Sequence, residues 1–145
     1  PWMVYSPLQV DNPVTIGDRT IRPIGANHTV PALGFHISCE QGSLVYSGDT
    51  LPNDAFWRTV NGIADLRYLI LETAFANRER DLAVTAKHLH PIQLAEELNR
   101  MRVDPQLCIT HLKPSDREQI AREIEAWAGR FQPRILQTGD VLDID

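Results

Sequence analysis

The sequence predicts an α/β (α+β) fold, in which a mixed sheet carries helices on one face. Two patterns support this class. Short apolar strands separated by turns open the chain, and from residue 43 onward strands alternate with helices. A length of 145 residues fits one domain, or part of one.

The β-rich opening is divided by turn-forming residues. Asp11-Asn12-Pro13 and Gly17-Asp18 tolerate the backbone angles that turns require, and Gln41-Gly42 marks a hairpin. Strands are therefore expected at residues 4–5, 14–16, 20–24, 33–39 and 43–47. Because no capping element precedes the first of them, this opening resembles the middle of a larger unit.

The second part of the chain predicts a helix that begins at Pro91, where the missing amide hydrogen of proline costs nothing. Its buried stripe is Leu94, Leu98 and Met101, at spacing i, i+4 and i+7. Further strands are expected at residues 69–71, 107–109, 135–136 and 141–144.

A second helix is predicted by a capping box, in which Ser115 and Glu118 would each satisfy an amide of the first turn. Glycine commonly follows a helix end, so Gly129 is expected to terminate it. The side chains expected on its buried face are Ile120, Ile124 and Trp127.

Charge and hydropathy exclude some classes of partner. The net charge of −5 works against non-specific binding to a nucleic-acid backbone. No apolar run approaches the roughly 18–20 residues that span a bilayer, and no signal segment opens the chain, so no membrane association is expected. Cys39 and Cys108 lie in apolar strands without CxxC spacing, which indicates buried free thiols and a cytoplasmic location.

Three apolar strands end in a side chain that can bind a metal or carry a proton. These side chains are Asp49, Glu72 and His111. In open α/β sheets, ligands bind beyond the carboxyl ends of the strands, where loops collect polar groups. Three such ends within a short stretch of sequence predict a common site.

Each candidate taken alone also has an ordinary structural interpretation. Asp49 follows a glycine and could be a turn residue, and Glu72 could be a surface carboxylate. His28 could be a loop histidine with a satisfied hydrogen bond, His111 could cap the next helix, and Lys113 could be a solvated lysine. His36 alternates with apolar neighbours and is expected to face solvent or a polar pocket, with no functional role.

The His88-Leu89-His90 pair has a spacing familiar from zinc sites. On a strand both rings would share one face, whereas on a helix they would point about 200° apart. Because Pro91 makes the pair a loop that leads into a helix, chelation by both rings is possible but not favoured. We expect one functional histidine and one structural histidine.

Taken in order, the segments around these residues resemble the metallo-β-lactamase superfamily. The resemblance rests on Asn27-His28 with the residues through Phe35, on Tyr46 through Thr50, and on Thr110-His111, and it extends over roughly residues 20–116. It is similar above all to class II cyclic-nucleotide phosphodiesterases and to the tRNA 3′-processing endonucleases (ribonuclease Z).

The resemblance implies half of an αββα sandwich and a site for two divalent metal ions at the rim between the halves. The ions are expected to be zinc, with manganese or iron as alternatives. By position, His28 would bind the first ion, Asp49 would bridge both, and His111 would bind the second. His88 would protonate the leaving oxygen, with Glu72 orienting it.

The HxHxDH motif that supplies most other ligands in that superfamily is absent, because the chain's one HxH is followed by Pro91, Ile92 and Gln93. The chain is therefore expected to be the C-terminal half of the fold (residues 1–145). Its partners would be the missing N-terminal half or another chain, and an isolated half is expected to self-associate as a homo-oligomer.

The expected function of the complete enzyme is hydrolysis of phosphodiester bonds through a water activated by the two ions. A small phosphodiester, a 3′,5′-cyclic nucleotide, is the favoured substrate, and Lys113 is expected to add positive charge near its phosphate. Alternatives are a ribonuclease Z-like endonuclease, a non-catalytic half-domain that binds a partner chain and, with less support, a redox di-iron protein.

Overall fold

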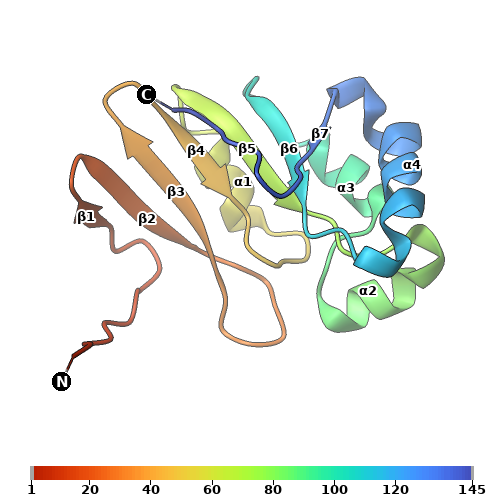
Figure 1. Cartoon of the computed structure of the whole chain (residues 1–145), viewed down its shortest axis with the longest axis horizontal. Coiled ribbons are helices and arrows are strands. Elements are labelled where there is room, and N and C mark those ends of the chain that lie inside the picture. Colours follow the sequence, from red (N-terminus) through yellow and green to blue (C-terminus); the bar gives the residue numbers. More distant parts are fainter. Residues whose placement is uncertain (1, 145) are drawn as a thin grey trace.

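The strands follow one another in sequence order across one mixed sheet (Figure 1). The computed structural model describes residues 2–144. Its strands are β1 (Val14–Ile16), β2 (Arg19–Gly25), β3 (Leu33–Cys39), β4 (Gly42–Tyr46), β5 (Leu66–Glu72), β6 (Gln106–Thr110) and β7 (Arg134–Ile135). Strands β1 to β4 are antiparallel and joined by short connections, whereas β4 to β7 are parallel.

Parallel neighbours need crossover connections, and helices supply them in the second part of the chain. These helices are α1 (Asp54–Val60), α2 (Arg80–Ala86), α3 (Pro91–Leu98) and α4 (Arg117–Ala128). Short 3₁₀ turns cover Asn77–Glu79, Pro114–Asp116 and Gly129–Phe131. Among residues 2–144, no helix is long and apolar enough to cross a membrane.

One face of the sheet forms the hydrophobic core. Val45, Leu69 and Leu107 lie side by side in the strand register, and all three are buried. They belong to one apolar cluster with side chains of α1, α3 and α4. This arrangement confirms a mixed sheet whose core helices pack on one face.

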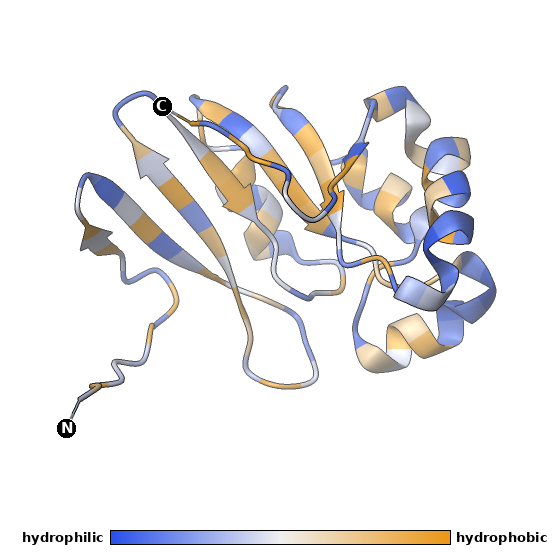
Figure 2. Cartoon of the chain, viewed as in Figure 1, coloured by the Kyte–Doolittle hydropathy of each residue, from blue (hydrophilic) through white to orange (hydrophobic). Residues whose placement is uncertain are grey.

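The opposite face is also apolar but is less covered. Because successive residues of a strand point to opposite faces, Phe35, Tyr46 and Ile70 form the next row across the sheet. All three remain half-buried, and Figure 2 shows the apolar bands on these strands. Part of this face is crossed by the C-terminal segment, where the Cys39 thiol donates to the Ile144 carbonyl at 3.5 Å.

Two predicted strands are wrong. Residues 141–144 form no ladder, because the segment runs across the strands rather than along an edge (Figure 1). Residues 4–5 pair with no strand either, and their side chains are exposed. The other predicted strands are confirmed, although the last lies one residue earlier than expected, at Arg134–Ile135.

The predicted helices are confirmed with corrections at their ends. The Ser115–Glu118 capping box does not form, because a 3₁₀ turn precedes α4 and the helix begins one residue later than the box requires. The Ser115 hydroxyl donates instead to the Asp116 carboxylate at 3.0 Å. Met101 lies beyond the end of α3, where it packs against the core while half-buried.

Trp127 is 53% exposed rather than buried. The buried stripe of α4 is Ile120, Ile124 and Ala128, at spacing i, i+4 and i+8, which leaves the indole at its edge. Helices α1 and α2 were not predicted, since seven residues each are too few to show a clear period. Asn53 caps α1 by accepting from the amides of Ala55 and Phe56.

Candidate metal centre

The carboxyl ends of β4, β5 and β6 bring three predicted site residues together. Asp49 follows β4, Glu72 is the last residue of β5, and His111 directly follows β6. The His111 Nδ1–H donates to Asp49 Oδ1 at 2.7 Å. The Thr50 amide, next to Asp49, donates to Glu72 Oε1 at 3.1 Å. The three strand ends therefore form one polar cluster at this edge of the sheet.

The backbone on either side of this cluster adopts left-handed conformations. Gly48 has φ +61°, and a Cβ there would lie 2.4 Å from the Leu33 carbonyl oxygen, so only glycine fits before Asp49. His111 has φ +67° without being glycine, which costs on the order of 1–3 kcal/mol. Such strain persists only where the surroundings hold it, and it is common at functional sites.

Glu72 is the buried anchor of the cluster, with a relative exposure of 0%, which excludes the surface interpretation. Its Oε1 accepts from the amides of Thr50 and Leu89 and from His88 Nδ1, each at 3.1 Å. Its Oε2 is buried without a hydrogen-bond partner among residues 2–144. A carboxylate fixed by two backbone amides is well suited to orient the imidazole that it contacts.

The His88 ring lies next to two other imidazoles. Its ring centroid lies 5.0 Å from that of His28 and 5.1 Å from that of His111. The hydrogen bond to Glu72 raises the pKa of His88, burial opposes this shift, and the negative charges of Glu72 and Asp49 reinforce it. Since Nδ1 donates to Glu72, the other ring nitrogen is left to face a substrate or an ion.

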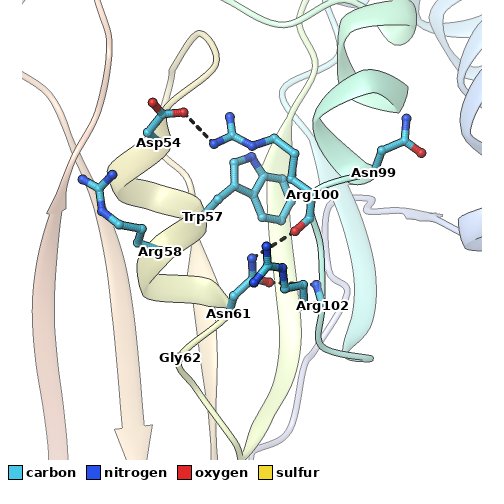
Figure 3. A pocket seen from close by; sticks show the side chains of 8 residues that line it. All are labelled: Asp54, Trp57, Arg58, Asn61, Gly62, Asn99, Arg100 and Arg102. Carbon is cyan, nitrogen blue, oxygen red and sulfur yellow. Dashed lines mark hydrogen bonds and ion pairs between the residues drawn. The ribbon is translucent and has the colours of Figure 1, made fainter.

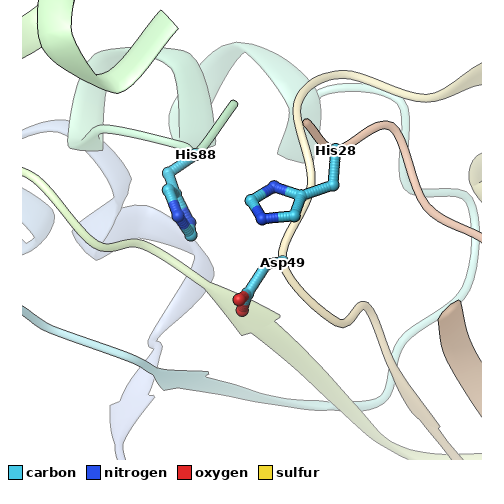
Figure 4. Close-up of side chains that lie close together, drawn as sticks. All are labelled: His28, Asp49 and His88. Atoms are coloured by element: carbon cyan, nitrogen blue, oxygen red, sulfur yellow. The ribbon is translucent and has the colours of Figure 1, made fainter. Parts of the chain in front are cut away.

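His28 lies on the loop between β2 and β3 and reaches the cluster from the other side. Figure 4 shows its ring converging with Asp49 and His88. Its Nδ1–H donates to the Lys87 carbonyl at 3.1 Å, which leaves Nε2 as the nitrogen with a free lone pair.

The two histidines of the HxH pair have different surroundings, as expected. His90 is 7% exposed, and its Nδ1 is 2.9 Å from Asn77 Oδ1. Burial lowers the pKa of His90. Only His88 belongs to the polar cluster, because His90 turns into the protein at the start of α3.

Lys113 lies beside the cluster but is already paired. Its Nζ is 2.9 Å from Glu79 Oε1 and 5.2 Å from the centre of the Phe75 ring. The Phe75 ring is in turn 5.7 Å from that of His88. The ammonium group is therefore near the site, with much of its charge balanced by Glu79.

His36, for which no functional role was expected, is half-buried in β3. It pairs with Val45 in the sheet, and so it lies on the helix-covered face. Its Nε2 is buried without a hydrogen-bond partner among the described residues. Burial lowers the pKa of His36.

The donor atoms fit a divalent metal. Two groups have donor atoms within 4.8 Å of one another: His28, Asp49 and His88 form one, and Glu72, His88 and His111 form the other. Imidazole nitrogen and carboxylate oxygen without thiolate suit zinc. His88 belongs to both groups, so geometry alone permits it to be a ligand as well as a proton carrier.

Several groups that hold the cluster in place were not predicted from the sequence. Asn27, Thr50 and Lys87 connect the segments that carry the candidate residues. Tyr46 also borders the site: burial raises the pKa of its hydroxyl, as do the charges of Asp49 and Glu72. Their position next to a candidate residue is the one signal that could have identified them.

A large cavity lies away from this cluster, between α1 and the segment that follows α3 (Figure 3). It has a volume of about 780 Å³ and contains none of the predicted site residues. Its lining includes Trp57, Arg58, Arg100 and Arg102. Arg100 is bound to Asp54 at 2.6 Å and to Glu97 at 3.2 Å. We therefore place the candidate site at the strand ends and not in this cavity.

No family model matches the chain, and no curated protein matches it. Solved structures do match. The metallo-β-lactamase fold protein YhfI from Bacillus subtilis superposes with a TM-score of 0.74 and 22% sequence identity, over 94% of this chain and 54% of its own. Human tRNase Z, short form (ELAC1), matches with a TM-score of 0.65 and 17% identity, over 93% and 48%.

Unliganded yeast PDE1 matches with a TM-score of 0.67 and 17% identity, over 90% of this chain and 47% of its own. The chain thus spans about half the length of these solved structures. At these identities the likeness establishes the fold. The chain has about half of a metallo-β-lactamase fold, which confirms the predicted fold class.

Proposed function

We propose that this chain forms one wall of a dinuclear metal site that hydrolyses phosphodiester bonds. The observation that carries the proposal is the buried Glu72–His88 pair, set beside His28, Asp49 and His111. A carboxylate-oriented histidine next to a group of metal-competent donors is the arrangement that acid-assisted hydrolysis needs. The fold shared with tRNase Z and PDE1 supports this reaction class.

In this proposal His28, Asp49 and His111 hold two divalent cations, zinc being favoured by the donor atoms. When bound, such ions lower the pKa of a coordinated water and stabilise charge on phosphoryl oxygens. His28 and His111 each lie next to His88, and Asp49 contacts His111 directly. That placement is consistent with one imidazole for each ion and a carboxylate between them.

His88 is the proposed proton donor to the leaving oxygen. Because its Nδ1–H is held by Glu72, the ring is fixed in orientation, and its Nε2 carries the transferable proton in the protonated form. The raised pKa of His88, caused first by the hydrogen bond to Glu72, keeps more of that form near neutral pH. Lys113, already paired with Glu79, would contribute positive charge at the edge of the site.

The site needs a second wall. Three protein ligands for each ion are usual in catalytic zinc sites, and the three proposed ligands of this chain are too few for two ions. The half-buried apolar row of Phe35, Tyr46 and Ile70 is a surface that another half-domain could cover. We propose that an N-terminal half or a partner chain supplies both the cover and the remaining ligands, with self-association expected in its absence.

The proposed substrate is a small phosphodiester such as a 3′,5′-cyclic nucleotide. The net charge of −5 disfavours a long polyanion, and the candidate cluster is open, with His111 44% and Asp49 34% exposed. Precursor tRNA is the second candidate, supported by the fold shared with tRNase Z. Cys39 and Cys108 are not joined in a disulfide, which suits the reducing cytoplasm that either substrate implies.

The test is to assay the intact, zinc-loaded protein on cyclic AMP and, separately, on precursor tRNA. Hydrolysis of cyclic AMP that is lost on chelation and restored by zinc would support the favoured function. Cleavage of precursor tRNA alone would move the assignment to the second candidate. No hydrolysis of either substrate, together with no bound metal, would favour a non-catalytic half-domain that binds a partner chain.

A further inference from the structure

Lys87 ends α2 in a conformation that directs both its carbonyl and its side chain toward the His28 loop. It is the C-cap of the helix, with φ +58° and ψ +54°. Its amide donates to the Val84 carbonyl at 3.2 Å, and the His88 amide donates to the Ala83 carbonyl at 2.9 Å. The helix end is therefore anchored immediately before His88.

Three hydrogen bonds then connect Lys87 to the loop that carries His28, about 60 residues earlier in the chain. The Lys87 Nζ donates to Asn27 Oδ1 at 3.1 Å and to the His28 carbonyl at 3.2 Å. In the reverse direction, His28 Nδ1–H donates to the Lys87 carbonyl at 3.1 Å. One residue thus holds His28 at both its backbone and its ring.

These bonds close a ring of contacts around the candidate site. The Asn27 amide donates to Thr50 Oγ1 at 2.9 Å, and the Thr50 amide donates to Glu72 Oε1. Glu72 holds His88, which follows Lys87 in the chain. The position of His28 is therefore coupled to that of His88 by contacts that pass through Lys87 on one side and Glu72 on the other.

We propose that Lys87 is a positioning residue: its ammonium group holds the His28 loop in place, so that its main-chain carbonyl keeps His28 in the Nδ1–H tautomer at a fixed distance from His88. The tautomer matters because it leaves Nε2 as the metal-binding nitrogen, and an outer partner of a ligating histidine commonly tunes its metal affinity. This inference rests on the proposed function for the metal, but the locking of His28 is a property of the metal-free chain. The chain's one other lysine, Lys113, is engaged with Glu79 and cannot replace it.

The test compares Lys87→Met, Lys87→Arg and a matched control, Arg58→Met, in the intact protein. Met keeps the apolar stem but removes the ammonium donor to Asn27 and to the His28 carbonyl, and Arg keeps a cationic donor. The Lys87 carbonyl remains in every variant, so a changed tautomer reports that the ammonium group holds the His28 ring against that carbonyl. Arg58 is an exposed cation on α1, outside the candidate site. The fold should survive Lys87→Met, because two other hydrogen bonds still hold the loop: the Asn27 amide donates to Thr50 Oγ1, and the Leu51 amide donates to the Asn27 carbonyl.

Two readouts are decisive. The first is the tautomer of His28 in the metal-free protein, measured by ¹⁵N chemical shifts of the ring. We expect one Nδ1–H form in the wild type and in Arg58→Met, and a mixture in Lys87→Met. The second is zinc affinity by chelator competition, which should fall about tenfold in Lys87→Met and recover in Lys87→Arg. On a cyclic nucleotide, kcat should fall with little change in KM.

A single tautomer together with wild-type zinc affinity in Lys87→Met would overturn the proposal. If the wild type binds no zinc, the proposed function fails, whereas the tautomer measurement still decides the role of Lys87. Should Lys87→Met unfold, Asn27→Ala removes one acceptor of the same clamp and leaves Lys87 in place. It should then shift the tautomer in the same direction by a smaller amount, and an unchanged tautomer would count against the clamp.

Discussion

The strand-end cluster and the arginine-lined cavity are two regions of this molecule that a ligand could enter, and they are built differently. The cavity is large, at about 780 Å³, but its central arginine is held by Asp54 and Glu97 at the surface. The cavity that His111 lines is smaller, at about 390 Å³, yet the cluster contains a fully buried carboxylate with three hydrogen-bond donors on one oxygen.

The difference shows that volume and chemistry are separate criteria for a site. The arginine-lined cavity is at the surface, so it requires no buried polar group and costs little free energy. Burying Glu72 costs the desolvation of a polar group, and a left-handed His111 costs backbone strain. A desolvated carboxylate or a strained backbone persists only where many surrounding contacts hold it in place. The hydrogen bonds at the strand ends provide such contacts.

The largest expected effect is on turnover, through His88. Replacing His88 with alanine in the intact protein should lower kcat about 10²- to 10⁴-fold, because a positioned proton donor contributes that much. Metal content, measured by elemental analysis, should remain unchanged. Loss of metal in this variant would make His88 a ligand, a role that its place in both donor groups permits.

The second expected effect concerns Glu72. Replacing Glu72 with alanine would leave the amides of Thr50 and Leu89 without an acceptor and would open a cavity in the buried centre of the cluster. The free energy of unfolding should fall by about 2–4 kcal/mol, measured by denaturant titration. Arg58→Ala, at an exposed position, should change it by less than about 0.5 kcal/mol. Equal effects at the two positions would contradict the assignment of Glu72 as the anchor.

Much of this architecture was predictable from local sequence, for reasons that differ between elements. The strand ends were found because Leu69–Leu71 and Leu107–Ile109 are apolar runs that stop at a polar residue. Topology then requires parallel strand ends to meet at one edge. The helix from Pro91 was found because its apolar spacing is sustained over two turns.

Other features depend on contacts between distant segments and leave no local pattern. Lys87 contacts a loop about 60 residues away, so apart from its position next to His88 nothing in the local sequence distinguishes it from a solvated lysine. The loss of the Ser115–Glu118 box depends on the 3₁₀ turn at Pro114–Asp116, which a capping motif alone does not predict. The burial of Glu72 likewise follows from the amides that surround it and not from its neighbours in β5.

The third prediction compares two glycines with a left-handed backbone, Gly48 beside the cluster and Gly17 in an open turn. Gly48 and Gly17 have nearly the same φ, at +61° and +62°, but a Cβ at Gly17 would meet nothing within 4 Å. Gly17→Ala should therefore cost only the left-handed conformation, about 1–2 kcal/mol. Gly48→Ala should cost clearly more, because its Cβ would also collide with the Leu33 carbonyl. Thermal unfolding of both variants measures the difference, and equal costs would show that the Asp49 turn can relax.

The smallest expected effect is that of replacing Arg100, which lines the cavity. The same variant could also show that the cavity takes part in substrate binding. Arg100 is 35% exposed, and its ion pairs with Asp54 and Glu97 are near the surface, where such pairs contribute little. Arg100→Ala should lower the free energy of unfolding by about 0.5 kcal/mol and leave kcat and KM unchanged, as measured on the substrate that the intact protein hydrolyses. A marked rise in KM with unchanged stability would instead make the cavity part of the substrate-binding surface. The strand-end cluster would then carry out only the chemical step, and the residues of α1 and of the segment after α3 would bind the substrate.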